Sequence, residues 1–251
     1  MAADGTVHVA RNGAWWTVTL DNPAEENALS AAMFDALADI LAEASRTPDC
    51  AVLLLEGAHG TFSRGRDRAG YARQRALGPL GLRAEFERIT RVNDLLVAAA
   101  PVTLAAVRGV AFGAACGLVA RCDLALAAHD ARFGFPEMRA GIPPTLVLAY
   151  VAKAFPHKRL FERILTGAEF DAAEALALGL VTRVVTTDVE QEARALAATI
   201  AASDPLHVRT CKQFWREVQD MSYGAAARYG AHVLAVVLGE RAEDRASPAG
   251  H

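Results

Sequence analysis

The sequence predicts an α/β fold in which strands and helices alternate along the chain. Short apolar runs of strand length alternate with longer segments whose apolar residues recur at helical spacing. This order indicates parallel strands joined by right-handed crossovers. The 251 residues are 53% hydrophobic and only 22% charged, so the chain has enough apolar surface to bury a large core.

The first three elements follow from side-chain periodicity. Residues 14–20 alternate between two faces, which predicts a strand. Ser30 is the expected N-cap of a helix, because apolar residues recur at helical spacing behind it as far as Thr47 and Pro48. Residues 50–55 form an unbroken apolar run, which suits a strand covered on both faces.

The same alternation continues through the middle of the chain. After a loop at residues 60–70, we expect a helix over 82–99, a strand over 101–107, a helix over 113–121 and a strand over 123–128. Each helix therefore connects two short buried strands.

The C-terminal quarter is predicted to be mainly helical. Asp171 and Glu174 have capping-box spacing at the start of a helix, Gly179 marks its end, and a short strand follows over 180–185. Three further helices are expected over 190–202, 205–218 and 222–238, with a frayed end over 240–251. We therefore expect a core over residues 1–188 and a helical region over 189–251 that packs against a neighbour.

Charge and composition exclude several classes of partner. The 26 Lys and Arg residues against 29 Asp and Glu residues give a net charge of −3, without a basic run that would follow a phosphate backbone, so no nucleic acid is expected. No apolar run reaches the length of a membrane span, and the first residues do not resemble a secretory signal, so we expect a cytoplasmic protein. The four cysteines are far apart and the histidines are scattered, which predicts reduced thiols and no metal site.

Two glycine-containing motifs can bind a negatively charged oxygen. In the first, Phe62-Ser63-Arg64-Gly65-Arg66-Asp67, the glycine permits a sharp turn that leaves backbone N–H groups unpaired; the alternative is a surface loop whose Asp67 caps a helix. The second, Gly113-Ala114-Ala115-Cys116-Gly117, places small residues at a helix N-terminus with its free N–H groups; the alternative is tight packing of helix on strand. The spacings do not match a dinucleotide-binding fingerprint.

A third motif, Phe133-Gly134-Phe135-Pro136-Glu137, offers an acid or base. Apolar surroundings raise the pKa of a carboxyl group toward the range in which it can both accept and return a proton. The alternative is a structural glutamate that stabilises a helix beginning at Pro136.

In their order and spacing, these motifs resemble the enoyl-CoA hydratase/isomerase, or crotonase, family. The resemblance covers most of the chain. It also includes Asn22-Pro23 with Asn27-Ala28-Leu29-Ser30, the stretch from Pro101 to Asp123, Gly141-Ile142-Pro143, and Leu165-Thr166-Gly167 with the residues from Ala172 to Val181.

The resemblance implies a crotonase-like spiral of repeated β-β-α units, with C-terminal helices that form a homotrimer or a dimer of trimers. It implies an acyl-CoA substrate, no separate cofactor, an oxyanion hole made by the backbone N–H groups of Arg64 and Ala114, and an acid/base role for Glu137. The residues expected to contact the substrate or its CoA are Ala28, Gly65, Arg66, Arg68, Gly113, Gly117 and Lys212; for the three cations, an ordinary solvated position is the alternative.

One departure from the family pattern bears on the reaction. Gly117 stands where a family hydratase carries its second catalytic glutamate. Two carboxylates hold and deprotonate a water in hydration, whereas a single base suffices to move a double bond, so the sequence favours isomerisation. The alternatives are hydration with a replacement acid from residues 71–87, and a member that binds acyl-CoA without catalysis. A hydrolase built on Ser63 lacks both the expected elbow motif and a placed histidine.

Overall fold

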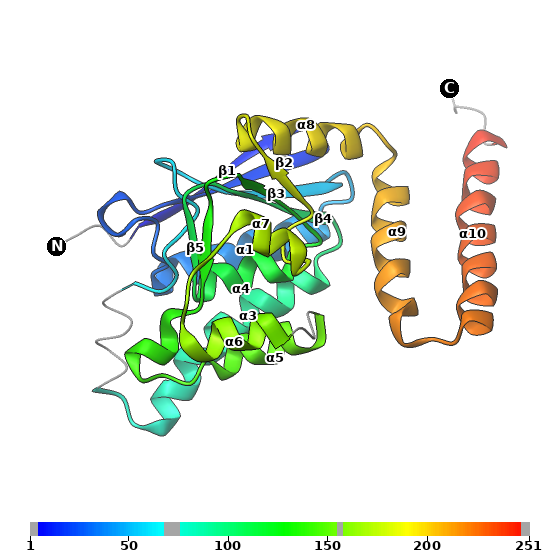
Figure 1. The fold of residues 1–251 in the computed structure, drawn as a ribbon. Helices are drawn as coiled ribbons and strands as arrows, with labels where there is room; N and C mark the ends of the chain where they lie inside the picture. Colours follow the sequence, from blue (N-terminus) through cyan, green and yellow to red (C-terminus); the bar gives the residue numbers. More distant parts are fainter. Residues whose placement is uncertain (1–4, 68–75, 155–157, 247–251) are drawn as a thin grey trace.

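The computed structural model describes residues 5–67, 76–154 and 158–246, with α/β architecture (Figure 1). The larger sheet has the strand order β1-β2-β3-β4-β6-β9, in which only β1 and β2 pair antiparallel. These strands are β1 (Thr6–Asn12), β2 (Trp15–Asp21), β3 (Val52–Gly57), β4 (Val102–Val107), β6 (Leu124–Ala128) and β9 (Arg183–Val185).

A second, small sheet gives the chain its spiral form. It has the order β5-β7-β8, formed by β5 (Val110–Phe112), β7 (Arg132–Gly134) and β8 (Phe170–Asp171). The chain passes from β4 to β5 through a tight turn at Gly109, whose φ is +63°. It passes from β6 to β7 through the short turn of residues 129–131. Two successive units therefore place one strand in each sheet before a helix follows, which confirms the expected β-β-α architecture.

Helices cover both faces of the larger sheet. On one face lie α1 (Ala31–Arg46), α3 (Pro79–Ala98) and α4 (Ala114–Arg121), and α8 (Val189–Ala201) lies on the other (Figure 1). The remaining elements before α8 are η1 (Pro23–Glu25), η2 (Pro136–Ala140), α5 (Thr145–Ala154), α6 (Lys158–Thr166) and α7 (Ala172–Ala177).

The local signals of the sequence have the expected geometry. Ser30 caps α1 by accepting a hydrogen bond from the Met33 N–H, and Asp171 caps α7 by accepting one from the Glu174 N–H. The apolar run over 50–55 is fully buried between the two helical layers, as expected for a strand covered on both faces. These caps define where α1 and α7 begin, and therefore where the loops before these helices end.

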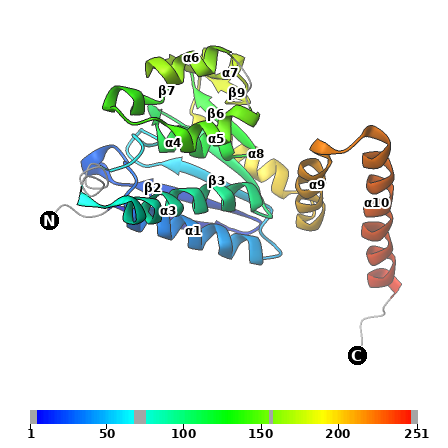
Figure 2. The same ribbon diagram turned by 90° about the horizontal axis from the view of Figure 1, so that it is seen from below.

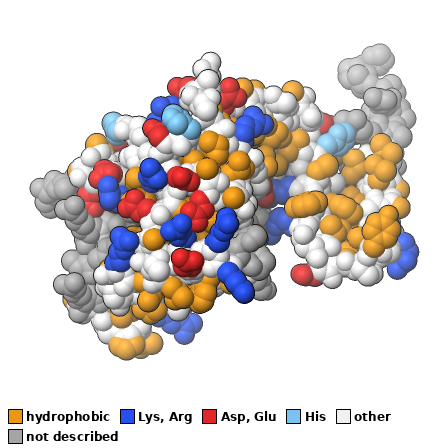
Figure 3. Space-filling view, viewed as in Figure 1, with side chains coloured by type: hydrophobic (Ala, Val, Ile, Leu, Met, Phe, Trp, Pro, Cys, Tyr) orange, Lys and Arg blue, Asp and Glu red, His pale blue; other side chains and the backbone are white. Residues whose placement is uncertain are grey.

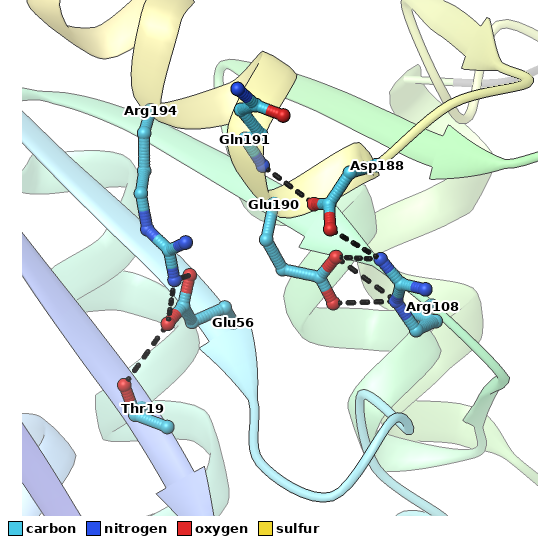
Figure 4. A network of polar contacts seen from close by, with 7 residues as sticks. All are labelled: Thr19, Glu56, Arg108, Asp188, Glu190, Gln191 and Arg194. Carbon is cyan, nitrogen blue, oxygen red and sulfur yellow. Dashed lines mark hydrogen bonds and ion pairs between the residues drawn. The ribbon is translucent and has the colours of Figure 1, made fainter.

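Ion pairs fasten α8 to the sheet and to the loop after β4 (Figure 4). Arg108 in this loop pairs with Glu190 of α8, and its Nη2 also lies 3.4 Å from Asp188. Arg194 of the same helix pairs with Glu56 at the end of β3. Although α8 lies in the expected C-terminal helical region of residues 189–251, this helix packs directly on the core sheet.

Of the last two helices, the first borders one end of the larger sheet and the second extends away from it (Figures 1 and 2). They are α9 (Pro205–Glu217) and α10 (Tyr223–Ala246), joined by η3 (Val218–Asp220). The expectation of a frayed end from residue 240 was wrong for residues 240–246, which continue α10. Apolar side chains on these helices are exposed, among them Trp215 and Leu234. Figure 3 shows hydrophobic side chains gathered on this part of the surface. In the part of the chain that the structure describes, no helix combines the length and hydropathy needed to cross a bilayer.

Candidate active site

The first glycine loop runs alongside the segment that leads into α4. The N–H of Phe62 donates to the Arg108 carbonyl at 2.8 Å, and the N–H of Ser63 donates to the Val110 carbonyl at 2.9 Å. The Ser63 carbonyl in turn accepts from the Phe112 N–H. Two loops distant in sequence are therefore locked together at the point where the small-residue helix begins.

Gly65 permits the closest approach between these two loops. Its φ is +93°, and a Cβ built on it would lie 2.7 Å from the Phe112 carbonyl oxygen and 3.5 Å from the Ala114 nitrogen. A side chain at this position would therefore both strain the backbone and push the loop away from α4. Gly65 therefore contributes to the site by having no side chain.

The expectation that the Arg64 N–H is an oxyanion donor was wrong, because this N–H is already engaged. It donates to the Glu26 carbonyl at 3.1 Å, while the Arg64 guanidinium pairs with the Glu26 carboxylate at 2.7 Å. The Gly65 N–H is engaged too, because it donates to Ser63 Oγ at 3.1 Å, but the amide after it has a different orientation. Leu29 binds the Gly65 carbonyl and the Asp67 N–H, so the N–H of Arg66 between them is directed away from Leu29.

The second expected donor, Ala114, is the first residue of α4. Its N–H donates to no group among the described residues, as expected for the first turn of a helix. Gly113 precedes it with φ +52° and ψ −119°, a conformation that side chains disfavour, and donates its own N–H to the Gly134 carbonyl at 2.8 Å. The Ala114 N–H thus lies at the positive end of the α4 dipole.

Glu137 directs its carboxyl group at this helix start. Its Oε1 lies 2.8 Å from the position that a Cβ on Gly113 would occupy. Its Oε2 is buried and has no hydrogen-bond partner among the residues that the structure describes. Burial raises the pKa of this carboxyl group, and only a hydrogen bond from its own backbone N–H opposes the shift.

The segment that holds Glu137 is anchored in the core by aromatic packing. Phe133 and Phe135 are fully buried, and Phe133 stacks on Phe170 at a centroid distance of 5.7 Å. Pro136 then begins the short helix η2, which carries Glu137 in its first turn. The carboxyl group is therefore held by rigid elements on either side of it.

Gly117 lies one turn further along α4 and leaves space in front of it. The residue itself is buried, yet a Cβ built on it would have no heavy atom within 4 Å. Glu137 therefore contacts the Gly113 position, Gly117 follows one turn later on α4, and no described side chain fills the position next to Gly117.

The residues expected to contact CoA have varied surroundings. The Arg66 side chain is only 10% exposed; its guanidinium lies over the ring of Phe86 and 3.9 Å from Glu85. Ala28 is buried and donates its N–H to the Glu25 carbonyl. Arg68 lies outside the described residues.

Lys212 is not placed to bind a phosphate of CoA, contrary to the expectation from its charge. Its ammonium pairs with Asp123 at 2.7 Å and donates to the Pro101 carbonyl at 2.8 Å. Only 6% of the residue is exposed, and burial lowers its pKa against the opposing effect of Asp123. Lys212 instead joins α9 to the ends of β4 and β6.

A buried asparagine, for which the sequence predicted no role, holds the first loop in place. Asn27 donates its side-chain amide to the carbonyls of Ala58 and Thr61, and its Oδ1 accepts from the Asn22 N–H. Asn27 is completely buried and has a φ of +56°. The two asparagines in the opening motif were the only signal of this role.

Among described residues, no group of three acidic, histidine or cysteine side chains could hold a metal ion.

The fold and the site together define a class: a two-sheet spiral in which backbone N–H groups at a helix start face a buried carboxyl group. The profile of the enoyl-CoA hydratase/isomerase family matches residues 11–241. The chain belongs to this family, whose members are enzymes.

Relatives and solved structures agree with this assignment. A carnitinyl-CoA dehydratase of Salmonella typhi is 32% identical over 231 residues, which covers 89% of this chain and 85% of the relative. A probable enoyl-CoA hydratase of Mycobacterium tuberculosis is 32% identical over 83% of this chain and 80% of its own length. The structure of AtuE from Pseudomonas aeruginosa superposes with a TM-score of 0.87 at 29% identity, covering 93% of this chain and 92% of AtuE.

Proposed function

We propose that this enzyme acts on an enoyl-CoA thioester and moves its double bond through an enolate intermediate. Glu137 removes a proton from one carbon of the acyl group and returns it to another. The observation that supports the proposal is the carboxyl group of Glu137, whose buried Oε2 has no partner among the described residues, beside the Ala114 N–H at the start of α4.

The thioester oxygen gains negative charge when the proton leaves, and fixed donors stabilise that charge. The Ala114 N–H supplies one donor, and the positive end of the α4 dipole adds to its effect. The N–H of Arg66, directed away from Leu29, replaces that of Arg64 as the donor from the first loop. Losing one such donor typically costs about 10²- to 10³-fold in rate.

The raised pKa of Glu137 suits a residue that transfers a proton from one carbon to another. Its raised pKa reduces the energy difference between the carboxylate that accepts the proton and the acid that returns it. Phe133 and Phe135 hold the η2 segment, so that one carboxyl group can serve both carbons without a large movement.

Hydration of a 2-enoyl-CoA is the second candidate. The names of the 32% identical relatives, a carnitinyl-CoA dehydratase and a probable enoyl-CoA hydratase, favour it. The space in front of Gly117 has room for a water, but Glu137 would have to activate that water without a second glutamate at this position.

Product analysis in ¹⁸O-labelled water distinguishes the two reactions. The protein is incubated with 3-enoyl-CoA and 2-enoyl-CoA substrates of several chain lengths, and products are identified by mass spectrometry. We expect 3-enoyl-CoA to become 2-enoyl-CoA without incorporation of ¹⁸O. Formation of a labelled 3-hydroxyacyl-CoA would show that the reaction is hydration rather than isomerisation. The absence of any conversion would overturn both proposals.

We propose further that the enzyme forms a homotrimer or a dimer of trimers through α9 and α10. The exposed apolar side chains of these helices, among them Trp215 and Leu234, support this assembly. Light scattering on the purified protein tests it, and a monomer at micromolar concentration would overturn it.

A further inference from the structure

The first loop contains a buried serine whose hydroxyl group binds the loop itself. Ser63 is completely enclosed, and its backbone is fixed on both sides: its N–H donates to the Val110 carbonyl at 2.9 Å, and its carbonyl accepts from the Phe112 N–H at 3.1 Å. Its Oγ accepts a hydrogen bond from the Gly65 N–H at 3.1 Å. Because the residue is enclosed and its backbone is fixed, this oxygen is a rigid acceptor.

The Ser63 hydroxyl orients the peptide group between Arg64 and Gly65. A serine oxygen that accepts from the N–H two residues later closes a small turn. The other end of this peptide is the Arg64 carbonyl, which accepts no hydrogen bond from the part of the chain that the structure describes. Within the described residues, the hydrogen bond to Ser63 is therefore the one that sets the direction of this peptide.

Gly65 connects this peptide to the one that carries the Arg66 N–H. The Gly65 carbonyl accepts from the Leu29 N–H, and the C=O and N–H of a trans peptide point in opposite directions, so the Arg66 N–H points away from Leu29. Gly65 itself has a φ of +93°, and a glycine rotates easily between several backbone conformations. The orientation of the Arg66 N–H therefore depends on the hydrogen bonds that hold the peptide groups on either side of Gly65.

We infer that Ser63 is a positioning residue, whose hydroxyl group holds the first loop in the form that directs the Arg66 N–H at the thioester oxygen. This inference rests on the proposed function, in which that N–H is the donor from the first loop. Without the hydroxyl, the buried Gly65 N–H would lose its acceptor, which is costly, and the loop would relieve this cost by rotating the peptide groups at Gly65. Ser63 thus acts through Gly65, not by attacking the substrate.

The carbonyl group of a bound thioester reports directly on the donors that face it. Hydrogen bonds to a carbonyl oxygen lower the C=O stretching frequency, and they do so more strongly when the donors are well aligned. The probe is hexanoyl-CoA, a saturated thioester without a double bond to move, labelled with ¹³C at the thioester carbonyl. Its infrared band is recorded free and bound, its affinity is measured by calorimetry, and kcat is measured with the enoyl-CoA that the wild type converts.

Two variants remove the acceptor, and a third provides the matched control. Ser63→Ala lacks the oxygen, and Ser63→Cys replaces it with a sulfur that is a weak acceptor. Ser45→Ala also removes a partly buried serine oxygen that accepts a backbone N–H, that of Ala100 at 3.3 Å. Ser45 lies in the last turn of α1, at the opposite end of this helix from Ser30 and the first loop. Thermal unfolding of each variant verifies that it is folded.

In the wild type, we expect the band of bound hexanoyl-CoA to lie at a lower frequency than that of the free thioester. In Ser63→Ala and Ser63→Cys, the band should return part of the way to its free position. Their kcat should fall by about ten- to a hundredfold, which is less than the loss of about 10²- to 10³-fold that is typical when a donor is removed completely. The affinity for hexanoyl-CoA should stay within a few-fold of the wild type. Ser45→Ala should match the wild type in band position, affinity and kcat.

A wild-type band position together with a wild-type kcat in both Ser63 variants would overturn the inference and leave the proposed function intact. A fall in kcat with the band at its wild-type position would also overturn it, because a purely structural role reduces turnover without changing the donors that face the carbonyl. If hexanoyl-CoA does not bind the wild type, or if binding does not lower its stretching frequency, the proposed function fails together with the inference.

Discussion

The carboxyl group of Glu137 occupies the space that a side chain at position 113 would fill. Its Oε1 lies 2.8 Å from the Cβ position of Gly113, and the next residue, Ala114, begins α4 with an N–H that donates to no described residue. The absence of a side chain thus allows an acid and a backbone donor to share one site. This arrangement couples the proton transfer to stabilisation of the charge that it generates.

Glu137→Gln should abolish proton transfer and preserve the site. The amide is nearly isosteric with the carboxyl group but cannot act as a base. We expect turnover of an enoyl-CoA to fall by about 10²- to 10⁴-fold, with the affinity for a saturated acyl-CoA within a few-fold of the wild type. Glu162→Gln, at an exposed position on α6, is the control. Unchanged turnover in Glu137→Gln would remove Glu137 from the mechanism.

The pH dependence of kcat/KM should reflect the burial of Glu137. The base must be ionised in the free enzyme, and burial raises its pKa. Activity should therefore fall, as the pH is lowered, at a higher pH than the ordinary pKa of a glutamate would give. An acidic limb at or below that ordinary value would show that this carboxyl group is not the base.

The raised pKa of Glu137 should also affect how the stability of the folded protein changes with pH. Because the folded state disfavours the ionised form, the wild type gains stability as the pH falls from the folded pKa of Glu137 toward that of the unfolded chain. Glu137→Gln has no ionisable group at this position and therefore lacks this gain. The thermal unfolding temperature of the variant should exceed that of the wild type by the largest amount at neutral pH, and this advantage should shrink in acid. An advantage that does not change with pH would contradict the assignment of the shift to Glu137.

Gly113→Ala should damage the site at the contact described above. The added Cβ would displace the Glu137 carboxyl group or the start of α4, and a displacement of about 1 Å from productive geometry can cost about 10²-fold in rate. Gly13→Ala is the control, since Gly13 also has a positive φ but its added Cβ meets nothing within 4 Å. Both variants should be less stable than the wild type, but only Gly113→Ala should lose kcat.

The sequence predicted the long, strongly patterned elements, because their signals are local. Ser30 and Asp171 are helix caps, and the unbroken run over 50–55 is a strand buried on both faces. It did not predict β5, β7 and β8, which have only two or three residues and no measurable periodicity. The strand β1 was missed because it is an edge strand with most of its side chains exposed or half-buried, and no expectation was made for α5 and α6.

The candidate site was predictable in residue type but not in orientation. The sequence indicated a glycine loop and a carboxylate, yet which N–H the loop directs at the substrate depends on its contact with Glu26, whose left-handed backbone is not visible in the sequence. Likewise, Lys212 was judged by its charge alone, whereas its partner Asp123 approaches it only through the packing of α9 on the sheet.

Lys212→Met should destabilise the protein without weakening CoA binding. Removing the lysine leaves the Asp123 carboxylate, which also accepts from Thr103, without its cation. Lys212 is buried but Asp123 is exposed, so losing this half-buried ion pair should cost about 1.5–3 kcal/mol of unfolding free energy, the usual range for a charged hydrogen bond. Lys158→Met, at an exposed position, should cost little. Denaturant unfolding measures the first effect and calorimetric titration with CoA the second; a selective loss of CoA affinity would restore Lys212 as a CoA ligand.

Gly117→Glu should introduce hydration. Among the described residues, nothing lies within 4 Å of a Cβ at position 117, and this position is one turn after Gly113, which Glu137 contacts, so we expect the new carboxylate to lie near that of Glu137. Two carboxylates can hold and deprotonate one water, so a 2-enoyl-CoA should yield a 3-hydroxyacyl-CoA at least about tenfold faster than with the wild type. Gly117→Gln fills the same volume without a charge and should not show this gain. If Gly117→Gln hydrates as fast as Gly117→Glu, the effect comes from shape; if neither does, the two carboxyl groups do not converge on one water.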